Sequence, residues 1–239
     1  MTKRKFAAFD IDGTVARDSI FFAVVDELIA KGHLPAESGV KISKKLEEYK
    51  SRKHSESYNE YSKLMVETLF GNIHNLSVKN YRTAVDKIMS GHKQYVYVYT
   101  RDLIKQLKSD GYFLIALSGS EMYAVQQFCN HHGFDVAMGD IYKEKDGIFT
   151  GEFEYIFGRK DIILKDLIKE HNLTLEGSIA VGDSKGDMGM FECVERPIAF
   201  NPESRLYDIA VERGWEIVVE RKNVIYELKP QGGKYHLES

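Results

Sequence analysis

Short apolar runs alternate with helical stretches along the second half of the chain, and this alternation restricts the possible folds more than any other feature. Each run is short enough to be a buried strand, and each stretch after it has helical periodicity. Such a chain folds as a mostly parallel, doubly wound sheet with helices on both faces. A further apolar run, Phe6–Phe9, lies near the N-terminus and leads into Asp10. We therefore expect an α/β fold, with strands over residues 6–10, 112–117, 178–181, 198–200 and 215–219 and helices over residues 103–107, 121–131, 161–171, 188–194 and 205–213.

A helical insertion separates the first expected strand from the others. Residues 20–31 are periodic and stop before Gly32, a residue that commonly follows the end of a helix. Residues 39–89 are charged, rich in tyrosine and free of proline, so we expect helices throughout. We predict a core domain of residues 1–16 and 94–239 that is interrupted by a helical cap domain of residues 17–93.

Two local signals complete the expected secondary structure. Asp146-Gly147 lies between two strand-like runs and predicts a hairpin over residues 143–151. The tail after Gln231 is polar and contains glycine, so we expect it to be frayed.

The composition excludes several classes of protein. The chain has 239 residues, 43% of them hydrophobic and 29% charged, with a net charge of −3. This balance is typical of soluble globular chains and gives no charge excess for a nucleic-acid or membrane surface. Cys129 and Cys193 are too few and too far apart for a disulfide framework or a zinc site, so we expect buried free thiols. The most apolar helical stretch, residues 20–30, contains two acidic residues and is too short to cross a bilayer. We expect a cytoplasmic protein that binds neither nucleic acid nor membrane.

Pairs of acidic residues follow two of the expected strands. Asp10 and Asp12 lie at the end of the first strand and just after it, and Asp183 and Asp187 follow the strand over residues 178–181. In open α/β sheets, ligands bind beyond the carboxyl ends of the strands. Oxygen ligands grouped there favour Mg²⁺, which takes one or two carboxylates and accepts a substrate phosphate. The simpler alternatives are a turn for the first pair and an acidic helix N-terminus for the second.

Candidate phosphate-binding groups occur at two further positions. Ser118 and Gly119 end the strand over residues 112–117 and precede a helix, where a hydroxyl and free amides can bind an anion. Lys160 opens the helix over residues 161–171, one turn before its apolar stripe, so we expect it to point inward. The alternatives are an ordinary helix cap for Ser118 and an exposed surface position for Lys160. The neighbouring Arg159 is the other candidate for the inward-facing cation. Together with the acidic pairs, these groups form a complete set for phosphoryl transfer.

These residues, in this order, resemble the four motifs of the haloacid dehalogenase superfamily: Asp10-Ile-Asp-Gly-Thr, Ser118, Lys160 and Gly-Asp183-Ser-Lys-Gly-Asp187. The resemblance covers residues 6–219 and implies a Rossmann-like core. Within the superfamily, the chain is most similar to the phosphoserine-phosphatase-like branch, subfamily IB, which carries a helical C1 cap between the first two motifs.

The resemblance also implies a role for each motif residue. Asp10 would be the nucleophile that forms an aspartyl-phosphate, and Asp12 would be the general acid and base. Ser118 and the Gly119 amide would bind the transferring phosphoryl group, and Lys160 would neutralise charge between Asp10 and the phosphate.

The metal site follows from the same resemblance. Mg²⁺ would bind Asp10, the backbone carbonyl of Asp12 and Asp183, with Asp187 as a further ligand or as a support for the ligands. The expected activity is hydrolysis of a small phosphorylated metabolite. The alternatives are transfer of the phosphoryl group to a second alcohol, as in a phosphotransferase or mutase, and a non-catalytic phosphate-binding role.

Two positions depart from the phosphoserine phosphatase pattern. Those enzymes carry a glutamate shortly after the first motif, where this chain has Asp18-Ser19, and an asparagine where this chain has Gly186. Substrate specificity should therefore come from the cap. The candidates for substrate recognition are Arg17, Asp18, Ser19 and Arg52, although the basic residues around Arg52 also suit a solvated helix face.

Overall fold

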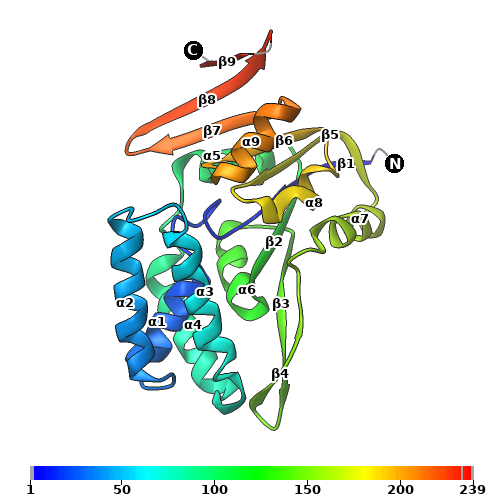
Figure 1. The fold of residues 1–239 in the computed structure, drawn as a ribbon. Coiled ribbons are helices and arrows are strands. Elements are labelled where there is room, and N and C mark those ends of the chain that lie inside the picture. Colours follow the sequence, from blue (N-terminus) through cyan, green and yellow to red (C-terminus); the bar gives the residue numbers. More distant parts are fainter. Residues whose placement is uncertain (1–2, 233, 238–239) are drawn as a thin grey trace.

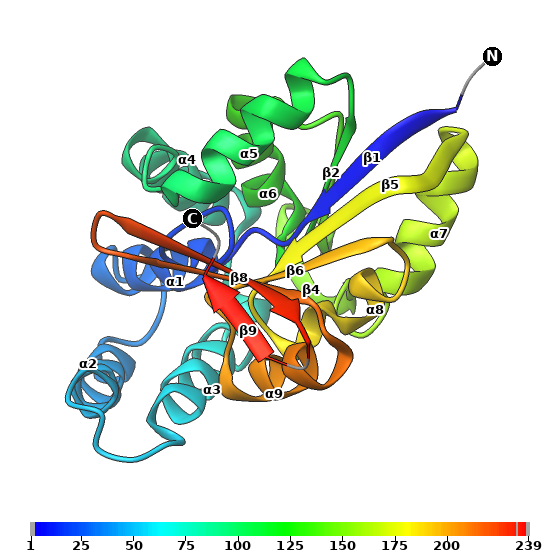
Figure 2. The same cartoon turned by 90° about the horizontal axis from the view of Figure 1, so that it is seen from above.

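The computed structural model describes residues 3–232 and 234–237, which contain one nine-stranded sheet in the order β4-β3-β2-β1-β5-β6-β7-β8-β9 (Figures 1 and 2). The strands are β1 (Arg4–Phe9), β2 (Phe113–Glu121), β3 (Val136–Lys145), β4 (Ile148–Glu154), β5 (Leu173–Gly182), β6 (Arg196–Phe200), β7 (Glu216–Arg221), β8 (Val224–Gln231) and β9 (Lys234–Leu237).

The centre of the sheet is parallel, as expected. β3, β2, β1, β5, β6 and β7 pair in parallel, and β1 lies between β2 and β5. At the end of β1, Phe9 pairs with Ala116 on one side and with Val181 on the other. The carboxyl ends of β1, β2 and β5 therefore meet, and the chemistry-bearing residues that follow them are brought to one edge.

Alternate residues of β1 face opposite sides of the sheet. Ala7 and Phe9 belong to one apolar cluster, whereas Phe6 and Ala8 belong to another. All four are fully buried. Helices α5 and α6 lie on one face of the sheet and α7 and α8 on the other (Figure 2). The expected doubly wound α/β fold is confirmed.

The helices of the described chain are α1 (Ile20–Ala30), α2 (Ala36–Lys50), α3 (Ser57–Phe70), α4 (Val78–His92), α5 (Val98–Ser109), α6 (Met122–His132), α7 (Lys160–Glu170), α8 (Met188–Phe191) and α9 (Ser204–Arg213), with short 3₁₀ turns η1 (Ile73–Asn75) and η2 (Lys185–Asp187). The helical stretch expected over residues 39–89 is thus divided among α2, α3 and α4 by two short connections.

Helices α1 to α4 form a group that projects from the carboxyl edge of the sheet (Figure 1). The chain enters and leaves this group through two paired segments. Arg17 N donates to Tyr95 O at 2.9 Å, and Tyr97 N donates to Val15 O at 3.1 Å. The β3–β4 hairpin also contacts the group, because Val78 N donates to the carbonyl of Gly147 at 2.9 Å.

The C-terminal part of the sheet differs from the sequence-based expectation. β8 pairs antiparallel with β7, and β9 pairs antiparallel with β8. The tail expected to be frayed after Gln231 is therefore a strand over Lys234–Leu237, and Gly233 and residues 238–239 lie outside the described residues. The prediction was wrong because these strands are stabilised by backbone pairing and by Tyr235, whose hydroxyl lies within hydrogen-bond distance of the carbonyl oxygens of Ala210 and Trp215, at 2.8 and 2.7 Å. Neither strand has the continuous apolar run of a buried one.

Two further expectations concern single features. Cys129 and Cys193 are both buried free thiols, as expected. In the part of the chain that the structure describes, no helix combines the length and apolar character needed to span a bilayer.

Candidate active site

The first acidic pair lies in a tight turn at the end of β1. Asp10 N donates to Val181 O at 2.9 Å, which anchors the turn to β5. Gly13 has a φ of +85°, a conformation that favours glycine. A Cβ at Gly13 would also collide with the carboxylate of Asp183. The glycine of the first motif therefore lets the turn approach the acidic loop after β5.

Asp12 is held by three hydrogen bonds. Ser118 Oγ and Ser120 Oγ donate to Asp12 Oδ2 at 2.9 and 2.8 Å, and Ile20 N at the start of α1 donates to Oδ1 at 2.6 Å. The carboxylate thus connects β1, β2 and the first helix of the cap. Ser120 was not among the residues that the sequence analysis selected. Its spacing could have identified it, because residues two apart on a strand share a face.

Ser118 does not cap the following helix. Glu121 is the N-cap of α6, and its carboxylate accepts hydrogen bonds from Tyr123 N and Ala124 N. Gly119 is exposed and lines the cavity described below. The expected turn at Ser118–Ser120 is instead the last part of β2, and its two serine hydroxyls point to Asp12 and not to the helix.

Lys160, the first residue of α7, points inward and is only 5% exposed. Its Nζ lies 2.7 Å from Asp10 Oδ1 and 2.6 Å from Asp187 Oδ1. Arg159, the N-cap of α7, is exposed. Burial alone would lower the pKa of Lys160, but the carboxylates of Asp10 and Asp187 outweigh it and raise this pKa. Lys160 is therefore a buried cation between two acids.

Asp187 shapes the loop after β5. Its Oδ2 accepts hydrogen bonds from Asp183 N at 3.1 Å, Ser184 N at 3.0 Å and Ser184 Oγ at 3.2 Å. Its Oδ1 binds Lys160. Both carboxylate oxygens are therefore engaged within the protein.

Asp10, Asp183 and Asp187 form a group that fits a divalent cation. One carboxylate oxygen of each lies within 4.8 Å of the others. Burial first, and then the charges of Asp10 and Asp187, raise the pKa of Asp183, and no described residue donates a hydrogen bond to its carboxylate. Burial also raises the pKa of Asp10 to about 7, against the lowering effect of Lys160. An all-oxygen donor set with an unpartnered, largely enclosed carboxylate suits Mg²⁺.

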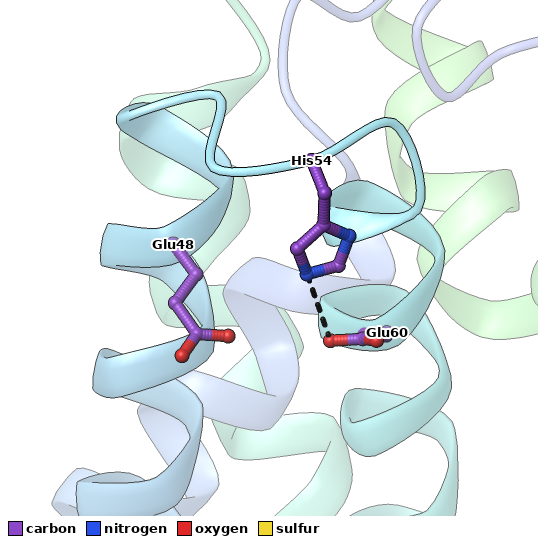
Figure 3. Close-up of side chains that lie close together, drawn as sticks. All are labelled: Glu48, His54 and Glu60. Atoms are coloured by element: carbon purple, nitrogen blue, oxygen red, sulfur yellow. Dashed lines mark ion pairs between the residues drawn. The ribbon is translucent and has the colours of Figure 1, made fainter.

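A second group of possible ligands, Glu48, His54 and Glu60, lies at the turn between α2 and α3 (Figure 3). Lysines already neutralise these carboxylates. Lys45 Nζ lies 2.9 Å from Glu48 and 2.6 Å from Glu60, and Lys53 Nζ lies 2.8 Å from Glu48. We interpret this group as an ion-pair network that joins the two helices.

A cavity of about 510 Å³ lies between the acidic residues and the cap helices. Ser19, the N-cap of α1, lines it. The other candidates for substrate recognition do not. Asp18 and Arg52 are exposed, and the guanidinium of Arg17 lies over the ring of Tyr97, 5.4 Å from its centroid. Arg17 and Asp18 were expected at the site because they follow the first motif closely, but proximity in sequence does not determine the direction of a side chain. Arg52 was expected there because of its basic neighbours, and its exposure agrees with the alternative of a solvated face.

Comparison with known proteins gives relatives for about half of the chain. Phosphoserine phosphatase from Methanocaldococcus jannaschii is 31% identical over 131 residues, which cover 54% of this chain and 60% of that protein. Phosphoserine phosphatase SerB1 from Mycobacterium tuberculosis is 30% identical over 135 residues, which cover 55% of this chain and 41% of that protein. The match therefore spans less than two thirds of each relative.

Solved structures share the fold over most of the chain. A protein of unknown function from Bordetella pertussis Tohama I has a TM-score of 0.71 at 22% identity, with 90% of this chain and 98% of that chain covered. A phospho-aspartyl intermediate analogue of phosphoserine phosphatase has a TM-score of 0.61 at 23% identity, with 92% and 95% covered.

A family model spans most of the core, the whole helical insertion and all four motif positions. It describes the haloacid dehalogenase-like hydrolases and matches residues 7–192. Asp10, Asp12, Ser118, Lys160 and Asp183 all lie within this range. The family expected from the motifs is confirmed: the chain belongs to the haloacid dehalogenase-like hydrolases.

Proposed function

We propose that the protein is a Mg²⁺-dependent phosphatase that hydrolyses a small phosphomonoester through an aspartyl-phosphate on Asp10. The observation that carries this proposal is the position of Lys160, whose ammonium binds Asp10 and Asp187 at the ligand-binding edge of the sheet. A buried cation there offsets the charge that would otherwise repel an anionic substrate from an anionic nucleophile. The names of the two phosphoserine phosphatase relatives support the same activity.

Asp10 is the proposed nucleophile. One of its carboxylate oxygens attacks the phosphorus, the bond from phosphorus to the leaving oxygen breaks, and the phosphoryl group is left on Asp10. Water then attacks the phosphorus and regenerates the carboxylate. Lys160 holds Asp10 Oδ1 at 2.7 Å, which fixes the direction of the carboxylate. Gly119, which lines the cavity, and the hydroxyl of Ser118 are the proposed groups that bind the phosphoryl oxygens. Ser118 would have to release its hydrogen bond to Asp12 in order to donate to the phosphoryl group.

Asp12 is the proposed general acid and base. It gives a proton to the departing alcohol and takes one from the attacking water. Ser118 and Ser120 contact the same carboxylate oxygen of Asp12. A hydroxyl can donate to an ionised carboxylate and accept from a protonated one. Both protonation states of Asp12 can therefore be held in one position.

Asp10, Asp183 and the backbone carbonyl of Asp12 are the proposed ligands of Mg²⁺. Asp187 supports their loop, because both of its oxygens already bind within the protein. When bound, Mg²⁺ would offset negative charge on the nucleophile and the phosphate.

Phosphate release from a panel of phosphomonoesters, with Mg²⁺ and with EDTA, tests this proposal. We expect release with Mg²⁺ only, and a loss of at least about three orders of magnitude in Asp10→Asn. Asp208→Asn, an exposed aspartate on α9, is the matched control and should retain full activity. Following the fate of the phosphoryl group in the presence of a second alcohol separates hydrolysis from transfer. A folded protein that releases and transfers no phosphate would exclude the proposed activity.

Two related expectations remain part of the proposal. We propose that residues 17–93 act as a cap over a core of residues 1–16 and 94–239, which the paired segments at Arg17 and Tyr95 support. We also propose that the protein acts in the cytoplasm on a small metabolite. The two buried free thiols are compatible with a reducing compartment.

A further inference from the structure

The cap half of the cavity has an uncharged lining. Ser19 lies at the start of α1, and the first turn of α1 and one side of α3 contribute Phe21, Phe22, Tyr58, Ser62, Val66 and Phe70. None of these side chains carries a charge at neutral pH. The pKa of the Tyr58 phenol is raised by partial burial and by Asp183, so this residue also remains neutral.

Aromatic residues continue the lining on the core side. Tyr142 lies on β3, and Tyr155 and Phe157 lie at and beyond the end of β4. Phe157 is 70% exposed, which is unusual for a phenylalanine. A Cβ at Gly186 would lie only 3.2 Å from Phe157 Cε2. The ring therefore covers Gly186.

The rings on the two sides of the cavity contact one another. Phe70 lies 6.4 Å from Phe21 and 5.6 Å from Tyr142, measured between ring centroids. Phe70 thus joins α1 and α3 to the β3–β4 hairpin. Such aromatic contacts keep the wall ordered before a ligand binds, so an apolar ligand would meet a preformed surface.

The charged residues of the cavity lining all come from the core and none from the cap helices: they are Asp10, Asp12, Asp140, Lys160, Asp183 and Asp187. Within the described chain, Lys160 is the only cation in the lining, and it is engaged by Asp10 and Asp187. Arg17 and Arg52 are outside the lining. A carboxylate on the leaving group would therefore be enclosed without a cation, which is costly. An ammonium group would likewise find no carboxylate in the cap half.

We infer that the site selects phosphomonoesters whose leaving alcohol is uncharged and largely apolar, such as an aryl-alkyl alcohol. This inference rests on the phosphatase activity proposed above and names the substrate class of that site. It separates this chain from enzymes that recognise the amino and carboxylate groups of phosphoserine.

Steady-state kinetics with three alkyl phosphates test the inference. We compare 2-phenylethyl phosphate, phosphoserine and phosphocholine, whose leaving groups are all primary alcohols but differ in charge. We expect kcat/KM for 2-phenylethyl phosphate to exceed both others by at least about tenfold. A preference for phosphoserine or phosphocholine would overturn the inference and leave the phosphatase proposal intact.

A positive charge placed in the cap half should weaken the preference for the uncharged leaving group. Val66 lines the cavity and is 39% exposed, so an arginine can be accommodated there. Val66→Arg should shift the ratio of kcat/KM values toward phosphoserine by at least about tenfold. Val40→Arg, at an exposed position on α2 outside the lining, is the control and should leave the ratio unchanged. An unchanged ratio in Val66→Arg would contradict the assignment of the cap half as the leaving-group site.

Binding of phosphonates separates this inference from the proposed catalysis, because phosphonates are not hydrolysed. Calorimetry with Mg²⁺ present compares 2-phenylethylphosphonate with 2-amino-4-phosphonobutyrate. Tighter binding of the first by at least about tenfold supports the inference even if no ester is hydrolysed, in which case the proposed activity alone fails. Equal binding, or tighter binding of the second, overturns the inference.

Discussion

Ser120 donates a hydrogen bond to Asp12, with 2.8 Å between Ser120 Oγ and Asp12 Oδ2. Ser120 is 2% exposed and lies on the same face of β2 as Ser118, which contacts the same oxygen. Two hydroxyls therefore hold one carboxylate oxygen of the proposed acid and base. This pairing gives a residue outside the four motifs a direct part in the site.

Ser120→Ala should lower kcat by about five- to tenfold with little change in KM, because it loosens Asp12 without removing a phosphate contact. Loss of one buried hydrogen bond should also cost about 1 kcal/mol of unfolding free energy. Steady-state kinetics and urea unfolding check both values. Ser90→Ala, which removes a hydroxyl that bonds within its own helix, is the control. Equal effects in the two variants would exclude a role for Ser120 in catalysis.

Lys160→Met should lower kcat/KM by about 10²–10³-fold, because Asp10 and the phosphate lose their buried cation. The free energy of unfolding should fall by about 3–5 kcal/mol, since removing one partner leaves buried carboxylates uncompensated. Mg²⁺ should restore more stability to this variant than to the wild type. Thermal unfolding with Mg²⁺ and with EDTA measures this difference. Lys165→Met, at an exposed lysine paired with Asp161, should change stability by under about 0.5 kcal/mol. A loss of similar size in both variants would contradict the prediction.

Gly13→Ala and Gly111→Ala should lower the free energy of unfolding by different amounts, although both glycines have a positive φ, of +85° and +81°. A Cβ at Gly111 meets no atom within 4 Å, whereas a Cβ at Gly13 collides with the Asp183 carboxylate. Gly111→Ala should therefore cost about 1–2 kcal/mol from backbone strain alone. Gly13→Ala should cost more and should weaken Mg²⁺ binding. Urea unfolding and Mg²⁺ titration of both variants test this, and equal costs would exclude a contact at Gly13.

Asp140 should make stability fall as pH rises from about 4 to about 6. Burial raises the pKa of this carboxyl in the folded protein to about 6, despite a hydrogen bond from Ile156 N and the charge of Lys160. Between the unfolded pKa of 3.8 and the folded pKa of about 6, the unfolded chain loses its proton first, so ionisation favours unfolding. The stabilising contribution of protonated Asp140 is therefore complete below pH 3.8 and lost above a pH of about 6.

Asp140→Asn isolates this contribution, because the amide oxygen can still accept the hydrogen bond from Ile156 N at 2.6 Å. The variant should gain stability relative to the wild type by about 2–3 kcal/mol between pH 4 and pH 7. Urea unfolding at several pH values measures the difference. Parallel stability curves for the two proteins would show that Asp140 has an ordinary pKa.

The parallel core could be predicted because its determinants are local. Residues 6–9 are apolar at every position, and such a strand must be buried on both faces of a sheet. The positions of Asp10 and Asp183 follow from the same pattern, since the carboxyl ends of parallel strands meet at one edge. Residues distant in sequence are thus brought together by the regular geometry of the sheet.

The C-terminal hairpin could not be predicted in the same way. β9 is held by pairing with β8 and by the hydroxyl of Tyr235, and neither contact produces an apolar run in the sequence. Edge strands of this kind depend on a neighbour that the local sequence does not identify.

The sequence by itself determined the family, the order of the strands along the chain and four acidic residues of the proposed site, Asp10, Asp12, Asp183 and Asp187. Only the tertiary structure decided which further side chains line this site, among them Asp140. Ser120 contacts Asp12, Phe157 covers Gly186, and Arg17 lies over Tyr97 instead of entering the cavity. The physical reason is that periodicity determines which face a residue occupies, whereas the direction of a side chain at a helix start or in a loop depends on packing against elements far away in the chain.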